Sequence, residues 1–284
     1  MGADAWQGWC EERDRAVAGV PGNLALVAFL PVGAEPVPVE QVPGATVRDA
    51  GGGALVWTAA DGTSVRLAGS GQQARRIHRE RWWFEAFSLD GRDVELRVYD
   101  ESAPALAAFG GIERWDFDER WVLPAVFTPA PAVDEVPWGF TRVVDDGHRK
   151  RVPGTVDLDL DGMRHRLTVF LDGTTPVLVF ADATTGTESY RPGRFLVLDV
   201  TPGPVPVSFE LDLNRAFLPP CAFSDAYSCP VPPPQNRLPV AVRAGERRVR
   251  PTGAPDGSHV CLIRRRCGNP PDLGSAVPRQ SSGG

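Results

Sequence analysis

The chain has 284 residues, of which 42% are hydrophobic and 23% charged, the composition of a globular protein that buries a sizeable core. Its net charge of −6 argues against a general nucleic-acid-binding protein, which needs a basic face. No stretch approaches the roughly 20 apolar residues that cross a bilayer, and Met1–Asp14 lacks the basic and apolar regions of a signal peptide. We therefore expect a cytoplasmic protein with neither nucleic acid nor membrane as a partner.

The first predicted element is a short helix within residues 1–22. Asp4 and Gln7 form an approximate capping box, and Gly19 and Pro21 end the run. Larger side chains follow helical spacing between them: Trp6, Trp9, Cys10, Arg13 and Val17. We expect this helix to pack its indoles on the sheet that follows.

Residues 23–250 are predicted to form a β-rich core in which the many prolines and glycines mark turns. The expected strands are Leu55–Thr58, Ser64–Leu67, Arg81–Ser88, Glu95–Tyr99, Trp121–Phe127, Val177–Phe180, Phe195–Val200, Val207–Leu211 and Val240–Arg243. Asp61–Gly62 and Asp90–Gly91 are hairpin turn signals. The fold class is thus mainly β, with antiparallel sheets in a sandwich or barrel-like core and an inner boundary near 128–152.

One hairpin is predicted residue by residue, over Thr155–Leu171. Apolar residues alternate with aspartates up to Asp161–Gly162, a type I′ turn signal. Folding there sets Leu160 opposite Met163, Asp159 opposite Arg164, Leu158 opposite His165 and Asp157 opposite Arg166. The same aspartates resemble the start of a calcium loop, but Thr168 occupies its twelfth position, so we predict no metal here.

A Pro-rich loop, Leu218–Pro239, and the connection Asp182–Tyr190 are long for a compact β domain. Residues 251–284 are polar and rich in Gly and Pro, and are predicted to be a flexible, dispensable tail.

Several segments together resemble one family. They are Phe180–Tyr190, Gly193–Phe195, Asp212–Asn214, Ala216–Phe223, Cys229–Pro230, Pro232–Pro239 and Ala244–Glu246, with weaker blocks at Leu96–Asp100, Phe109–Ile112, Glu12–Asp14 and Gly22–Val27. Over about residues 5–250 the chain is similar to the bacterial domain-of-unknown-function family 1684. That resemblance implies no activity, because the family has none assigned. Many relatives carry a histidine between the two loop cysteines, where this chain has Ser224–Ser228.

Standard catalytic and nucleotide-binding motifs are absent from the sequence, and the four histidines, His78, His148, His165 and His259, show no metal-ligand spacing. The cysteines are odd in number and scattered: Cys10, Cys221, Cys229, Cys261 and Cys267. In a reducing cytosol they are expected to be free thiols. For Cys221 and Cys229 the alternatives are a disulfide, a zinc site completed by the last two cysteines, and a nucleophile with His165 as its base.

The predicted site lies where Leu218–Pro239 meets Asp182–Arg194. Its catalytic candidates are Asp182, Tyr190, Cys221 and His165, and its ligand-binding candidates are Arg97, Arg194, Asn214 and Asn236. Arginine holds a carboxylate through two hydrogen bonds, Tyr and Asn orient it, and Asp acts as a base. The structural alternative is that Arg97–Asp100 and Arg194–Asp212 are ion pairs and the asparagines satisfy loop backbone.

The functional prediction is a protein without metal or cofactor that acts on or binds a small polar organic molecule in a β-walled pocket under the Pro-rich loop. The sequence leaves open whether it is an enzyme. The alternative is a protein–protein interaction module that uses the Pro-rich loop or a sheet edge and has no catalytic activity.

Overall fold

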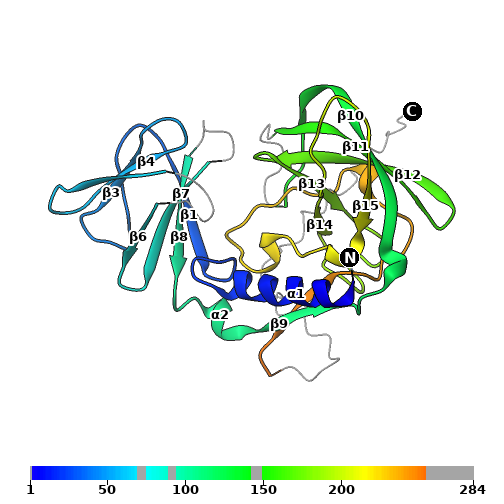
Figure 1. The fold of residues 1–284 in the computed structure, drawn as a ribbon. Coiled ribbons are helices and arrows are strands. Elements are labelled where there is room, and N and C mark those ends of the chain that lie inside the picture. The colour runs from blue at the N-terminus through cyan, green and yellow to red at the C-terminus, as the bar shows by residue number, and fades with distance from the viewer. Residues whose placement is uncertain (1, 69–74, 89–93, 142–148, 254–284) are drawn as a thin grey trace, which may run out of the picture.

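The computed structural model describes residues 2–68, 75–88, 94–141 and 149–253. Asp90–Gly91, His148, His259, Cys261, Cys267 and nearly all of the predicted tail lie outside these ranges, so the predictions made for them are not addressed below. The fold is mostly antiparallel β, as predicted, and its strands gather into two lobes (Figure 1). No helix in the described ranges combines the length and the apolar character needed to span a membrane.

The N-terminal lobe packs two four-stranded sheets face to face. The first has the order β1 (Leu26–Val32), β8 (Val94–Asp100), β7 (Trp82–Phe87) and β6 (Arg76–Arg79). The second has the order β2 (Val37–Pro38), β3 (Thr46–Asp49), β4 (Leu55–Thr58) and β5 (Ser64–Leu67). Trp57, Phe84 and Leu96 are buried between them, and β4 and β5 have the bounds that were predicted for the segments on either side of Asp61–Gly62.

The C-terminal lobe is a half-barrel built from one curled, six-stranded sheet. Its order is β14 (Arg194–Val197), β13 (Thr175–Phe180), β12 (Met163–Asp172), β11 (Arg149–Leu160), β10 (Val122–Pro137) and β15 (Val207–Asp212). The concave side holds a separate apolar core that includes Phe127, Leu167 and Phe180. The predicted inner boundary, 128–152, lies inside the β10–β11 pairing, while the change from one core to the other falls between Val98 and Trp121.

The predicted hairpin is confirmed with its register. β11 and β12 pair Asp157 with Arg166, Leu158 with His165, Asp159 with Arg164 and Leu160 with Met163. Asp161 and Gly162 have positive φ angles of 51° and 75°, as a type I′ turn requires. Met163, which the alternation placed on the core face, is 51% exposed because it lies at the open tip of the hairpin.

The two lobes are joined along one side by α1 (Ala3–Ala18), α2 (Pro104–Ala108), β9 (Phe109–Arg114) and β16 (Glu246–Pro251) (Figure 1). The predicted cap of α1 is wrong, since Gly2 is the N-cap and Asp4 lies in the first turn. The predicted packing is wrong as well: Trp6 donates to the Asn214 carbonyl at 3.1 Å, in the C-terminal lobe.

The end of the chain also differs from the prediction. Val240–Arg243 forms no strand; the last strand is β16, which pairs with β9 and includes Pro251, so the ordered fold extends into the predicted tail. Leu218–Pro239 contains no strand or α-helix. It holds two 3-10 turns, η4 (Pro220–Ala222) and η5 (Pro234–Asn236), whereas η2 (Glu119–Trp121) and η3 (Leu213–Arg215) flank β10 and β15.

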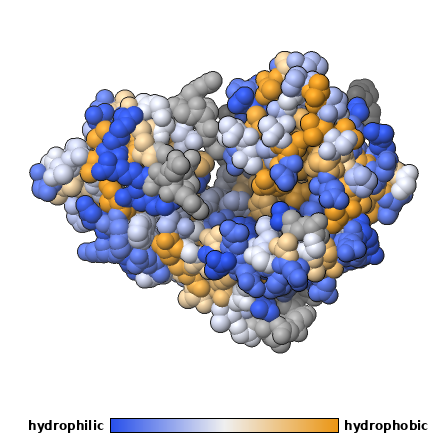
Figure 2. Space-filling model, viewed as in Figure 1, coloured by the Kyte–Doolittle hydropathy of each residue, from blue (hydrophilic) through white to orange (hydrophobic). Residues whose placement is uncertain are grey.

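A space-filling view shows how the two lobes shape the surface (Figure 2). The surface is hollowed between the lobes, and hydrophobic residues gather mainly over the C-terminal lobe in this view (Figure 2). The irregular segments between residues 213 and 245 pack on the same apolar core as the strands of the half-barrel, through Leu213, Ala216, Leu238, Val242 and Ala244.

Candidate functional site

Arg194 and Asp182, two of the predicted site residues, form an ion pair inside the C-terminal lobe. Arg194 Nη2 lies 2.5 Å from Asp182 Oδ2, and neither side chain is exposed to solvent. Arg194 also donates to the carbonyls of Ala244 and Val242. Burial lowers the pKa of Arg194, and the Asp182 carboxylate opposes that shift. The predicted partner of Arg194, Asp212, is therefore wrong.

The two predicted asparagines satisfy backbone groups. Asn236 accepts from the Thr168 amide at 2.7 Å and donates to the carbonyls of Thr168 and Val179, thereby joining η5 to β12 and β13. Asn214 accepts from the Asp118 amide at 3.1 Å and donates to its carbonyl at 3.0 Å. Both are fully buried, which agrees with the structural alternative given for them.

Of the remaining candidates, Tyr190 and Cys221 are in contact, whereas Arg97 and His165 lie on other elements. Tyr190 donates to the Cys221 carbonyl at 2.8 Å, and its pKa is raised by burial. Arg97 belongs to the N-terminal lobe, where it pairs with Glu95 at 3.0 Å rather than with Asp100. His165 lies on β12, and no contact in the described ranges joins it to Cys221.

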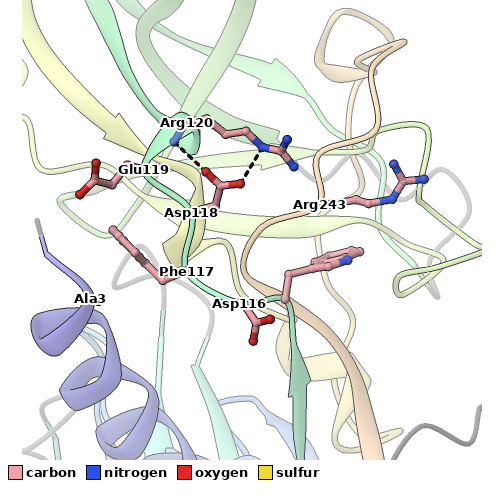
Figure 3. A pocket seen from close by; sticks show the side chains of 8 residues that line it. Ala3, Asp116, Phe117, Asp118, Glu119, Arg120 and Arg243 are labelled. Atoms are coloured by element: carbon pink, nitrogen blue, oxygen red, sulfur yellow. Dashed lines mark hydrogen bonds and ion pairs between the residues drawn. The ribbon is translucent and has the colours of Figure 1, made fainter.

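The predicted site residues therefore do not share one opening. A cavity of about 600 Å³ lies elsewhere, between the first residue of α1, the segment after β9, and a loop near the C-terminus (Figure 3). It is lined by Ala3, Trp115, Asp116, Phe117, Asp118, Glu119, Arg120 and Arg243. A second cavity, of about 240 Å³, lies between β14 and β15.

Two of the predicted site residues, Asn214 and Arg194, contact lining residues of the larger cavity from the interior of the protein. Asn214 fixes both the amide and the carbonyl of Asp118. The guanidinium of Arg194 lies 5.0 Å from the Trp115 ring centre, and that of Arg247 lies 4.9 Å from it. Because these groups are buried or half-buried, Trp115 and Asp118 are held in fixed positions.

The charges around the cavity do not cancel. Arg120 pairs with Asp118 at 2.8 Å, and Arg243 pairs with Glu188 through two hydrogen bonds of 2.9 and 2.8 Å. The Arg243 guanidinium lowers the pKa of Glu188. Asp116 and Glu119 make no ion pair within the described ranges, and both are exposed at the rim. The cavity is thus net negative.

Aromatic rings supply the apolar part of the lining. Trp115 and Phe117 alternate with Asp116 and Asp118, and Phe117 packs at 6.1 Å from the Trp6 ring of α1. This alternation of rings and carboxylates was the sequence signal for the site, and the sequence analysis missed it. Among the described residues, no group of three or more His, Cys, Asp or Glu side chains is placed to hold a metal ion.

Comparison with known proteins assigns the family but no activity. Residues 107–247 match the model of a family described as "Protein of unknown function (DUF1684)". The chain belongs to this family. It is 34% identical to the uncharacterized protein from gene locus rrnAC0354 of Haloarcula marismortui, which has a solution NMR structure. The match covers 49% of this chain and 77% of that protein, and the TM-score is 0.39. No curated protein matches. The family match includes Trp115–Arg120 and Arg243 of the cavity.

Proposed function

We propose that this member of the family binds a small polar organic molecule, and that the ligand is a cation such as a primary amine. The observation that carries the proposal is a cavity of about 600 Å³ whose rim holds two carboxylates, Asp116 and Glu119, beside two aromatic rings. A volume of this size suits a small metabolite.

The chemistry of the lining favours an amine over an anion. Carboxylates accept hydrogen bonds from an ammonium group, and the ring of Phe117 attracts a cation, whereas the Trp115 ring already carries the guanidiniums of Arg194 and Arg247. The two arginines at the cavity are already paired with Asp118 and Glu188, so they offer little to a carboxylate. Asp4 in the first turn of α1 compensates the positive end of the helix.

The proposal does not require catalysis. Arg194, whose pKa is lowered by burial, lies behind the wall and is not part of the lining. Binding needs only the carboxylates and rings of the lining, so a binding protein accounts for the site with fewer assumptions than an enzyme does.

Three isosteric probes test the charge preference: n-butylamine, n-butanol and butyrate. Titration followed by NMR should show saturable shifts with the amine, weaker shifts with the alcohol and none with the acid. The double substitution Asp116→Asn/Glu119→Gln should weaken amine binding at least tenfold, since it removes both carboxylates that accept from the ammonium.

A matched control removes the same charge elsewhere. Glu35→Gln/Glu40→Gln changes two exposed carboxylates of the N-terminal lobe and should leave binding unchanged. Equal binding of amine and butyrate, or equal loss in both double variants, would contradict the proposal. Native mass spectrometry of freshly purified protein would then identify any retained natural ligand.

A second candidate is peptide binding by strand addition at the open side of the half-barrel. β14 and β15 are the two edges of the six-stranded sheet, and the cavity of about 240 Å³ lies between them. Val197 at this cavity is 50% exposed, and acidic Asp199 and Glu210 lie beside it. An extended peptide with alternating valine and lysine fits this lining.

Fluorescence anisotropy with a labelled (Val-Lys)4 peptide tests this candidate, with (Val-Glu)4 as the control. Val197→Asp should abolish binding of the basic peptide if the edge is used. The Asp116→Asn/Glu119→Gln variant should bind it normally, so the two candidate functions give opposite results with the same pair of variants.

The compartment is also a proposal. Cys10, Cys221 and Cys229 are buried and form no disulfide in the structure, which accords with a reducing cytoplasm. A measurement of free thiols in protein extracted under acid quench tests this assignment, because a secreted form would be found oxidised.

A further inference from the structure

The segment from Cys221 to Cys229 is held at both ends by the C-terminal lobe and touches the N-terminal lobe at its middle. The Tyr190 hydroxyl donates to the Cys221 carbonyl at 2.8 Å, and the Thr141 hydroxyl accepts from the Cys229 amide at 3.0 Å. Between these ends, Ser224 Oγ donates to the Leu26 carbonyl of β1 at 2.6 Å. Tyr227 packs with Leu26 and Tyr99 of the N-terminal lobe.

The two thiols of this segment are neighbours. The Cys221 amide donates to Cys229 Sγ at 3.3 Å, and the Tyr190 hydroxyl lies 3.7 Å from Cys221 Sγ. Neither cysteine forms a disulfide in the structure, and each is 4% exposed. The Cys229 sulfur therefore lies against the backbone of Cys221, close enough to its thiol for a hydrogen bond between the two side chains.

Their surroundings differ from those of the third described cysteine. Hydrogen bonding by Cys229 lowers the pKa of Cys221, and Lys150, a buried amine on β11, interacts electrostatically with Cys229. Burial instead raises the pKa of Cys10 to about 11. Cys10, 6% exposed, thus supplies a control thiol of similar burial without a thiol partner.

We propose that Cys221 and Cys229 are a redox-active dithiol that a hydroperoxide converts reversibly into a disulfide. In the first step the Cys221 thiolate attacks the hydroperoxide, the O–O bond breaks, and Cys221 becomes a sulfenic acid; the alkoxide that leaves (hydroxide for hydrogen peroxide) takes the proton that the Cys221 thiol gave up. Next the Cys229 thiolate attacks that sulfur, the S–O bond breaks, and the hydroxide that leaves takes the proton of the Cys229 thiol and becomes water. One hydroperoxide takes two electrons from the pair, and a thiol reductant returns them.

The disulfide closes a loop whose ends are eight positions apart and whose middle contacts β1. Closure restricts the conformations of the segment that presents Ser224 and Tyr227 to the N-terminal lobe. The oxidised protein should hold its lobes together more firmly than the reduced protein does.

The test uses the full chain with Cys261→Ser/Cys267→Ser, so that only the three described thiols remain. After treatment with one equivalent of hydrogen peroxide and quenching with an alkylating agent, non-reducing peptide mapping should find a Cys221–Cys229 crosslink. Cys10 should remain at least tenfold less oxidised. The Tm should rise by roughly 5 °C and return on addition of dithiothreitol.

Cys229→Ser provides the second readout. Cys221 should then stop at the sulfenic acid and be trapped by dimedone, because the resolving thiol is absent. Circular dichroism establishes that this variant folds; if it does not, the crosslink map of the parent protein decides alone. Oxidation of Cys10 at the same rate, over-oxidation of Cys221 without a crosslink, or no oxidation at all would overturn the proposal.

Discussion

The two lobes are small β folds that are stabilised in different ways. In the N-terminal lobe two sheets cover each other, and the buried Glu85 pairs with Arg76, which is 24% exposed. In the C-terminal lobe one sheet curls alone, and fully buried polar groups such as Arg194, Asn214 and Asn236 lie among its irregular segments.

Backbone hydrogen bonding explains the difference. A segment that joins no sheet must satisfy its amides and carbonyls by other means, and water is excluded from the interior. Arg194 provides such partners for the carbonyls of Val242 and Ala244, and Asn214 for the amide and carbonyl of Asp118. Asn236 instead bonds Thr168 of β12 and Val179 of β13, one residue beyond the last β12–β13 pair, Val169–Leu178. The family-matched residues 107–247 coincide with this lobe, so many of its distinctive polar residues serve the fold.

The largest effect is expected when the buried ion pair between Arg194 and Asp182 is broken. Asp182→Asn removes the charge that offsets Arg194, and we expect a loss of about 3–5 kcal/mol in the free energy of unfolding. The N-terminal counterpart, Glu85→Gln, leaves Arg76 near solvent and should cost only about 1 kcal/mol. Denaturant unfolding of both variants measures the contrast, and equal losses would remove the distinction between the lobes.

The second prediction concerns the Asn236 side chain, which makes hydrogen bonds to three backbone groups. Asn236→Ala leaves the Thr168 amide and the carbonyls of Thr168 and Val179 without their partner, at a cost of about 3 kcal/mol. Gln235→Ala is the matched control, because this exposed neighbour bonds only the Thr168 hydroxyl and should cost less than about 1 kcal/mol. A similar melting temperature for the two variants would show that the segment is held by packing alone.

The third prediction is a pH dependence in the hairpin. Hydrogen bonding from Arg166 lowers the pKa of Asp157 below its usual 3.8. Its stabilisation is therefore complete above about pH 4 and is lost as the pH falls through the lower, folded-state pKa. Because Arg166 is 67% exposed, the pair contributes only about 0.5–1 kcal/mol.

Two substitutions separate this effect from general acid unfolding. Asp157→Asn should flatten the acid limb of the stability curve slightly, whereas Asp159→Asn, on the same face of the strand but exposed to solvent, should not. Urea unfolding between pH 2 and pH 6 makes the comparison. Identical curves for the two variants would assign the acid response to other carboxylates.

How much of the fold the sequence predicts depends on how local the deciding interactions are. Period-two alternation and an Asp-Gly turn determine the β11–β12 register, because both act between residues close in the chain. β9 and β16 pair across more than 130 residues, and nothing in Phe109–Arg114 or Glu246–Pro251 alone signals a partner. Long-range pairing of this kind is invisible to local pattern.

The site was harder to predict than the fold for a related reason. Arg194, Asn214 and Asn236 have the residue types of a ligand site, and the same hydrogen-bonding capacity serves a buried backbone equally well. Only the fold shows which use is made of it. The alternation Trp115–Asp116–Phe117–Asp118 was readable, but the opening in front of it is formed by the distant Ala3 and Arg243.

The smallest effect is expected from a truncation that locates the C-terminal end of the folded protein. Pro251 pairs with Phe109, and the Thr252 amide donates to the Ala108 carbonyl at 2.9 Å, so the chain contributes to the joint between the lobes as far as Thr252. We expect truncation after Gly253 to change the Tm by no more than about 1 °C, in keeping with the predicted dispensable tail.

Truncation eight residues earlier, after Gly245, is the informative control. It removes β16 together with Glu246, which is fully buried, pairs with Arg13 at 3.3 Å and accepts from the Leu218 amide at 2.7 Å. Leaving Arg13, Arg114 and that amide without their shared carboxylate should lower the Tm by more than 10 °C, on the order of 3 kcal/mol or more. A loss of several degrees on truncation after Gly253 would show that residues beyond it also stabilise the joint. Thermal scans of the two truncations thus locate the end of the folded protein between Gly245 and Gly253, or beyond it.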